Sequence, residues 1–89
     1  MAGLKVEDVF VSRADRYALG IDIENSQPVF LLPVTNRMTD YEEIYRLTIQ
    51  EYEGFLGDRA LALAFRDRAA RRELDDRLVL KPGADRGYW

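Results

Sequence analysis

The chain contains no cysteine and no histidine among its 89 residues. Without cysteine it has neither a disulfide nor a thiolate nucleophile. Without histidine it lacks the usual imidazole acid–base catalyst and the Ser-His and Cys-His nucleophile pairs. Zinc, copper and haem sites ordinarily need one of these two residues, so only an oxygen-ligand site for magnesium or calcium remains open. We therefore expect no enzyme activity, no cofactor and no metal.

Long apolar runs and an excess of positive charge are also lacking. No stretch approaches the length of a membrane span, and the N-terminus lacks the basic-then-apolar pattern of a signal peptide. The net charge is −3, and an acidic chain is repelled by phosphate. We therefore expect a soluble, cytoplasmic protein that binds neither membranes nor nucleic acid.

The short length of the chain sets a limit on its core. We expect residues 1–89 to form a single domain with a tail at residues 84–89. A chain of this size buries only about 60–65% of its unfolded surface, and it has no disulfide to compensate. Self-association is the remaining source of stability, so we expect a homodimer or a higher homo-oligomer rather than a monomer.

Three strands are predicted in the first part of the chain. Residues 6–12 are rich in valine, which favours a strand. Residues 17–24 alternate between apolar and polar side chains, which predicts a half-buried strand. Residues 28–34 are apolar on both faces and have Pro28 and Pro33 toward their two ends, which predicts a central strand. Short polar turns at residues 13–16 and 25–27 would join them into an antiparallel meander.

Residues 40–56 fit two patterns. Their apolar residues match one helical stripe, but residues 41–47 also alternate like a strand. Thr48 and Glu51 have the spacing of a capping box, which indicates a new helix start at Thr48. We therefore predict a fourth strand at 41–47 and a helix at 49–56, with a single helix over 40–56 as the alternative.

A second helix is predicted after Gly57. Gly57 would end the first helix as a left-handed cap, and Asp58 would cap the next, which runs to about residue 72. Leu78, Val79 and Leu80 could add a short C-terminal edge strand. The predicted fold class is α+β, with a meander sheet of three to four strands followed by two helices on one face. A partner subunit could cover the other face.

The segment after the most apolar strand concentrates the polar chemistry. Asp40, Glu42 and Glu43 could hold magnesium or act as an acid–base pair. On a strand, Asp40 and Glu42 would share one face and Glu43 the other. The alternative, which we favour, is that these acids cap a turn and pair with nearby arginines.

Other residues of this segment, and the last residue of the chain, suggest contact rather than catalysis. Asn36 and Arg37 favour a turn and an ion pair, although an arginine can also clamp a carboxylate or phosphate. Tyrosines can line an interface or fill a core, and a terminal Trp89 can anchor an interface. The candidate contact residues are Asn36, Arg37, Asp40, Tyr41, Glu42, Glu43, Tyr45 and Trp89.

The chain resembles a family of small bacterial proteins of unassigned function. The resemblance rests on the run of residues 17–37 and on Asp40, Tyr41, Glu42 and Glu43, and the family has a phrase similar to PVSNRLVDYEEYY after an apolar strand. Residues 72–76 and 81–83 resemble the family's C-terminal segment. The chain departs from the central phrase at Thr35, Met38 and Thr39. The resemblance implies no activity, cofactor or partner.

Together these patterns predict a non-enzymatic binding or assembly module that acts as a homo-oligomer through residues 36–45 and the C-terminal tail. One alternative is a small-ligand or magnesium-dependent site built on residues 36–43. Another is an immunity or antitoxin-like protein, because a small acidic fold suits a basic partner.

Overall fold

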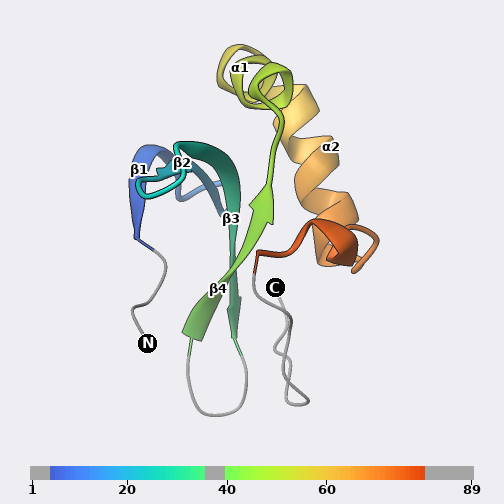
Figure 1. The fold of residues 1–89 in the computed structure, drawn as a ribbon. Coiled ribbons are helices and arrows are strands. Elements are labelled where there is room, and N and C mark those ends of the chain that lie inside the picture. The colour runs from blue at the N-terminus through green and yellow to red at the C-terminus, as the bar shows by residue number, and fades with distance from the viewer. Residues whose placement is uncertain (1–4, 36–39, 80–89) are drawn as a thin grey trace.

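Four strands and two helices form the described part of the chain. The computed structural model describes residues 5–35 and 40–79 (Figure 1). The strands are β1 (Val6–Ser12), β2 (Tyr17–Asp22), β3 (Gln27–Thr35) and β4 (Asp40–Arg46), followed by the helices α1 (Ile49–Gly57) and α2 (Arg59–Ala70) and a short 3₁₀ helix, η1 (Asp75–Arg77). Each strand pairs antiparallel with its neighbour in the order β1-β2-β3-β4. The predicted α+β meander followed by two helices is confirmed.

The boundary between β4 and α1 is set by a capping box. The Thr48 hydroxyl accepts a hydrogen bond from the Glu51 amide at 3.1 Å, and the Glu51 carboxylate accepts one from the Thr48 amide at 2.9 Å. Thr48 itself has an extended backbone, so the helix does not extend back into β4, which ends at Arg46. These two bonds satisfy helix-terminal amides that would otherwise lack partners. The alternative of a single helix over residues 40–56 is therefore wrong.

One residue forms the corner between the two helices. The Asp58 backbone is extended; its amide donates to the Gly54 carbonyl, and its side chain accepts from the Ala60 amide at 3.0 Å. Asp58 therefore ends α1 and caps α2. The prediction that Gly57 forms a left-handed cap is wrong, because no glycine among the described residues has a positive φ. The extended conformation of Asp58 turns the chain instead.

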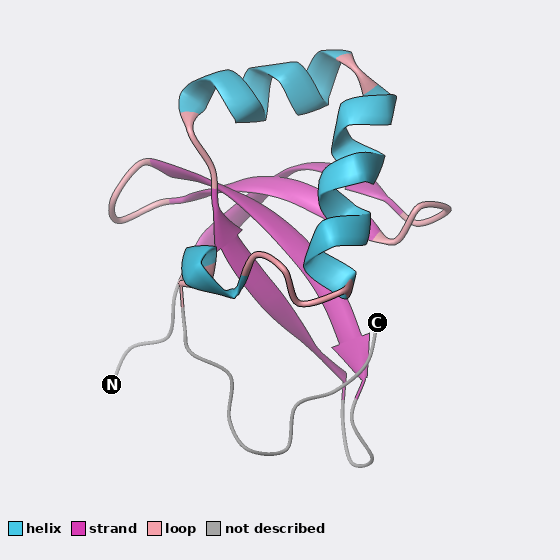
Figure 2. Cartoon of the chain, turned by 90° about the vertical axis from the view of Figure 1, so that its right-hand side faces the viewer, coloured by secondary structure: helices cyan, strands magenta, loops and turns pink. Residues whose placement is uncertain are grey.

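The main core lies between one face of the sheet and the helices (Figure 2). Phe30, on the central strand β3, is fully buried at the middle of an aromatic cluster. Its ring stacks on Tyr17 at 5.1 Å and lies 4.7 Å from Phe65 of α2 and 6.1 Å from Phe55 of α1. Aromatic rings of this size supply much of the buried area of a small domain. The core therefore joins the sheet to both helices.

The other face of the sheet, called here the outer face, carries a second, smaller apolar cluster. Ala18, Val29 and Leu31 form its buried centre, and Val6, Ile44 and Val79 pack against them. The prediction that the third strand is apolar on both faces is thus explained, because β3 contributes to both clusters. The three central side chains are already buried in the single chain, and the other three are partly buried.

The strand β2 is shorter than its alternating pattern predicted. It ends at Asp22 instead of residue 24, and Ile23 is 55% exposed rather than half-buried. The Asp22 carboxylate accepts hydrogen bonds from the Glu24 amide at 3.1 Å and from the Asn25 side chain at 2.9 Å. A side chain that bonds to the backbone two residues ahead favours a turn, and this turn ends the strand.

The described chain ends beside β4. Leu78 forms an isolated antiparallel bridge with Tyr45, and the Val79 amide donates to the Ile44 carbonyl at 2.8 Å. This bridge coincides with the start of the predicted edge strand, whose last residue, Leu80, lies outside the described residues. None of the helices in the described ranges is long and apolar enough to cross a bilayer.

Candidate functional site

The three acids of the predicted site are separated by the geometry of β4. Asp40 is exposed and accepts a hydrogen bond from the Thr35 hydroxyl at 2.8 Å. Glu42 lies on the outer face, where side chains alternate along the strand. Glu43 lies on the opposite face and is buried. No three acidic side chains in residues 5–35 and 40–79 lie close enough together to hold a metal ion.

Glu43 and Tyr45 belong to the core and not to the predicted contact surface. Tyr45 is fully buried, and Glu43 is 7% exposed. The Tyr45 hydroxyl donates to Glu43 at 2.7 Å and lies 3.4 Å from the Ala69 carbonyl of α2. A buried carboxylate needs such a donor. The sequence pattern could not separate a core tyrosine from an interface tyrosine, because both have alternating apolar neighbours.

The remaining candidate residues divide into two groups. Tyr41 is half-buried and packs against the main core, while Asp40 and Glu42 stay at the surface. Asn36, Arg37 and Trp89 lie outside the described residues. Of the candidate contact residues that the structure describes, only Asp40 and Glu42 therefore present their polar groups at the surface.

Glu42 borders a small hollow on the outer face near the β1–β2 turn. The hollow has a volume of about 280 Å³, and its walls are mostly apolar. Burial raises the pKa of Glu42, and the negative charge of Asp8 adds to this effect. The lining residues are Val11, Ser12, Arg13, Arg16, Tyr17, Ala18, Pro33 and Glu42. Besides Glu42, the hollow is bordered by the Ser12 hydroxyl, which already donates a hydrogen bond to Asp15 at 3.2 Å.

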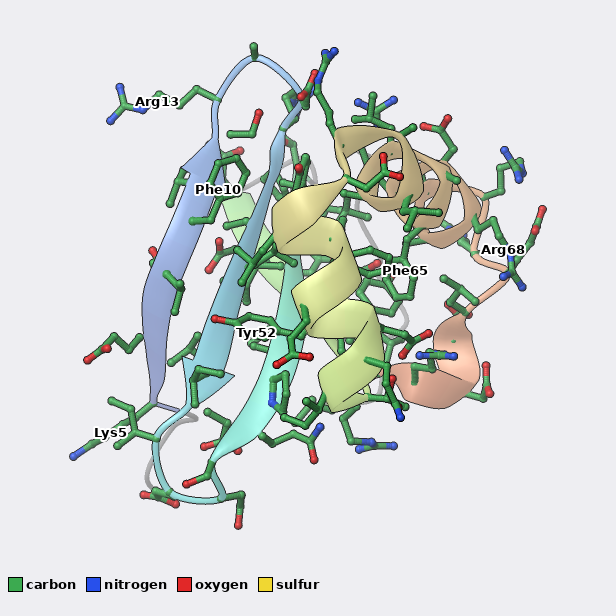
Figure 3. All side chains as sticks on the ribbon, turned by 90° about the horizontal axis from the view of Figure 1, so that it is seen from above. Lys5, Phe10, Arg13, Tyr52, Phe65 and Arg68 are labelled. Atoms are coloured by element: carbon green, nitrogen blue, oxygen red, sulfur yellow. The ribbon has the colours of Figure 1, made fainter. Side chains whose placement is uncertain are left out.

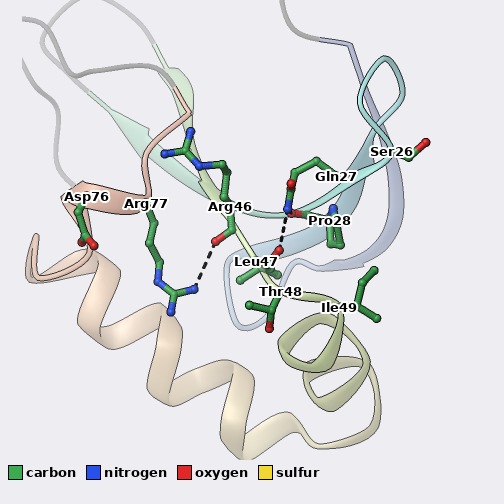
Figure 4. Close-up of a pocket in the computed structure, with 9 residues that line it drawn as sticks. All are labelled: Ser26, Gln27, Pro28, Arg46, Leu47, Thr48, Ile49, Asp76 and Arg77. Atoms are coloured by element: carbon green, nitrogen blue, oxygen red, sulfur yellow. Dashed lines mark hydrogen bonds between the residues drawn. The ribbon is translucent and has the colours of Figure 1, made fainter.

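A larger hollow of about 580 Å³ lies where the end of β4 meets the start of α1 (Figure 4). Its lining comes from the β2–β3 turn, the start of β3, the end of β4, the link to α1, α1 itself and η1: Ser26, Gln27, Pro28, Arg46, Leu47, Thr48, Ile49, Asp76 and Arg77. The sequence analysis did not single out this place. Its one signal was the capping box at Thr48, which we interpreted only as a helix start.

Most polar groups of this larger hollow hold the fold together. The Gln27 amide donates to the Leu47 carbonyl at 2.7 Å. Arg77 pairs with Glu51 at 2.6 Å and reaches the Arg46 carbonyl at 3.4 Å. Burial opposes ionisation of Glu51, but the hydrogen bonds from Arg77 and Thr48 outweigh it and lower the pKa of Glu51. Throughout the described ranges, every buried side-chain nitrogen and oxygen has a hydrogen-bond partner. The hollow therefore has no buried polar group waiting for a ligand.

The surface with the most exposed apolar side chains is β1, at the edge of the sheet. Val9, Phe10 and Val11 are 50%, 41% and 54% exposed. β1 pairs with β2 along one side, and no other strand in the described ranges pairs with its outer side. Figure 3 shows β1 at the side of the sheet away from the helices, and the labelled Phe10 lies on this strand. Strand edges of this kind can pair with another chain.

The sequence contained a signal for this edge that the interpretation did not use. Three consecutive apolar residues on a strand cannot all face one core, because neighbouring side chains point to opposite faces. Val9 to Val11 therefore require either burial on both faces or exposure on at least one. The structure shows exposure of all three, because neither helix extends over β1 (Figure 3).

Comparison of the chain with protein-family models, with curated protein sequences and with solved structures finds no match. A function for the chain must therefore be inferred from its residues and their geometry.

Proposed function

We propose that this protein is a non-enzymatic assembly module that acts as a homo-oligomer through the edge strand β1. The observation that supports the proposal best is the exposed run of Val9, Phe10 and Val11 on a strand with one unpaired side. An apolar strand edge left in water is a liability for a monomer, so natural proteins usually cover it. A second chain would cover it by adding a strand.

The opposite edge of the sheet is a weaker candidate for the contact. Leu78 bridges Tyr45 and the Val79 amide bonds to Ile44, so part of the outer side of β4 is occupied by the chain itself. Tyr45 and Glu43 are buried there. The contact surface that the sequence analysis assigned to residues 36–45 therefore moves, in this proposal, to β1.

The chain is small enough that association would matter for its stability. A domain of this length has a marginal core, and the chain has no disulfide. Burying these three exposed apolar side chains would stabilise the assembly by about 25 cal/mol for each Å² of apolar surface removed from water. Most soluble oligomers are built from copies of one chain, and dimers with two-fold symmetry are the commonest kind.

The test is the mass of the full chain in solution, measured by sedimentation equilibrium and light scattering over a wide concentration range. We expect a mass above the 10.3 kDa of one chain, rising with concentration. Val11→Asp should return the protein to one chain, because it places a charge in the contact. Leu61→Asp is the matched control: Leu61 is equally exposed at 51%, but it lies on α2.

Circular dichroism of each variant would show that the fold is kept. A wild-type protein that stays at the mass of one chain up to millimolar concentration would overturn the proposal. An oligomer weakened equally by Val11→Asp and Leu61→Asp would overturn the role of β1.

A further inference from the structure

The charges along β1 and the turn that follows it have an uneven distribution. The acids Glu7 and Asp8 lie in its first half, while Arg13 follows its last residue. Neither Glu7 nor Arg13 takes part in an ion pair within the described ranges. Figure 3 shows Lys5 and Arg13 at the two ends of this edge, both pointing outward and away from the helices. These charged side chains thus frame the exposed apolar run.

This distribution favours one orientation of a partner strand. If a second copy of β1 lay parallel, each acid would face an acid and each arginine an arginine. If it lay antiparallel, the acidic half of each strand would face the basic end of the other. Opposite charges directly across two strands stabilise the pair, and like charges destabilise it. The charges therefore suit an antiparallel copy of the same strand.

A bulge limits where the axis of such a pair can lie. The pairing of β1 with β2 shifts between Asp8 and Phe10, so Val9 is an extra residue on this strand. A bulge locally disrupts the ladder and bends the strand. Regular pairing resumes at Phe10 and continues through Val11 and Ser12. Phe10 is thus the first regularly paired residue after the bulge, and an axis there places Glu7 of each copy opposite Arg13 of the other.

We infer that the partner is a second copy of this chain, docked antiparallel through β1 about a two-fold axis at Phe10, so that two four-stranded sheets join into one. The inference rests on the proposed function and specifies its geometry. Val9 of each copy then faces Val11 of the other, and Glu7 faces Arg13.

The proposed contact is small, so we expect it to be weak. Each chain contributes one seven-residue strand to it. Such a contact buries much less surface area than the interface of a permanent dimer. We therefore expect a reversible dimer whose population depends on concentration. The two symmetric pairs of Glu7 and Arg13 would select the orientation and register more than they add affinity.

The absence of cysteine makes cross-linking an unambiguous test of the axis. In a Phe10→Cys variant of the full chain, the new thiol would face its own copy across the axis. Opposite Cα atoms in antiparallel strands lie about 4.5–5.5 Å apart, which suits a disulfide. Mild oxidation should give a covalent dimer quickly. Leu61→Cys and Ile49→Cys, at similarly exposed positions on the helices, should cross-link only slowly.

A charge exchange tests the orientation separately. Glu7→Arg alone and Arg13→Glu alone each turn two favourable pairs into repulsive ones, and each should weaken dimerisation about five- to tenfold. The double variant carrying both changes should recover most of the wild-type dissociation constant. Glu53→Arg, an exposed position on α1, is the control for net charge.

The outcomes separate this geometry from the proposed function. A dimer in which Phe10→Cys cross-links no faster than Leu61→Cys would overturn the axis at Phe10 and leave assembly standing. A double charge variant no better than either single variant would overturn the antiparallel arrangement. A wild-type chain that never dimerises would overturn both proposals.

Discussion

Gly20 lies where β1 passes close to β2. A Cβ atom built on it would stand 2.7 Å from the Glu7 carbonyl oxygen and 2.8 Å from a Val6 methyl group. The oxygen belongs to the backbone and cannot move aside without shifting the strand. The position thus needs glycine for space, not for an unusual backbone conformation, because its φ is not positive.

We therefore expect Gly20→Ala to reduce the free energy of unfolding by about 1–3 kcal/mol, measured by urea denaturation. Gly57→Ala is the matched control. A Cβ at Gly57 meets nothing within 4 Å, so this change should leave stability unchanged or raise it by about 0.5–1 kcal/mol. Equal urea midpoints for the two variants would contradict the close contact in the sheet.

Asp15, in the turn after β1, carries the most strongly shifted carboxyl group. Arg59 at the start of α2 donates two hydrogen bonds to it, at 2.7 and 2.8 Å. These bonds, with help from the Ser12 hydroxyl, lower the pKa of Asp15 to about 2. This pair joins the β1–β2 turn to the helix.

Because the pKa of Asp15 is lower in the folded state than in the unfolded chain, the ionised group stabilises the fold above pH ~4. This contribution should disappear as the pH falls through the folded pKa of about 2. Arg59→Ala should raise the pKa of Asp15 toward its ordinary value, as followed by NMR titration of the carboxyl carbon. If the pKa stays near 2 in that variant, Arg59 is not its cause.

At the scale of elements, Asp58 is the single residue that joins α1 to α2. Its side chain satisfies the Ala60 amide, one of the unpaired donors at the start of α2. Asp58→Ala should lower the free energy of unfolding by about 1 kcal/mol, because it removes this acceptor. Asp58→Asn keeps an acceptor oxygen and should behave like wild type in the same denaturation experiment. If both variants lose the same stability, the negative charge of Asp58 and not its hydrogen bond supports the corner.

Local chemistry explains why most elements were predictable and why some boundaries were not. The Thr48 and Glu51 capping box identified the start of α1, because both partners lie within four residues. The end of β2 was missed, because it depends on the side chain of Asp22, which is buried and bonded to the turn. Gly57 was misinterpreted because its neighbour Asp58 turns the chain.

The candidate site was less predictable because burial depends on contacts between distant segments. Glu43 and Glu42 are adjacent acids, and nothing local distinguishes the buried one from the exposed one. Glu43 is buried because α2 packs over its face of β4, where Tyr45 also meets the Ala69 carbonyl. The exposure of Phe10 likewise depends on where the helices end, which no strand pattern contains.

At the scale of the whole molecule, reversible association predicts a link between stability and concentration. If only folded chains form the dimer, the melting temperature rises as the protein concentration rises. We expect this rise for the wild-type protein in scanning calorimetry and expect it to vanish for Val11→Asp. A melting temperature independent of concentration for the wild type would argue against a folded dimer.

The meander order of the sheet also bears on how fast the chain reaches its fold. The strands pair in the order in which they occur in the sequence, and four residues separate each strand from the next. Few long loops must close before the sheet forms, and chains with mainly local pairings fold quickly for their size. β1, one of the two edge strands, is also the first to leave a ribosome. It must therefore wait for β2 and would present its exposed edge to other nascent copies before the core has formed.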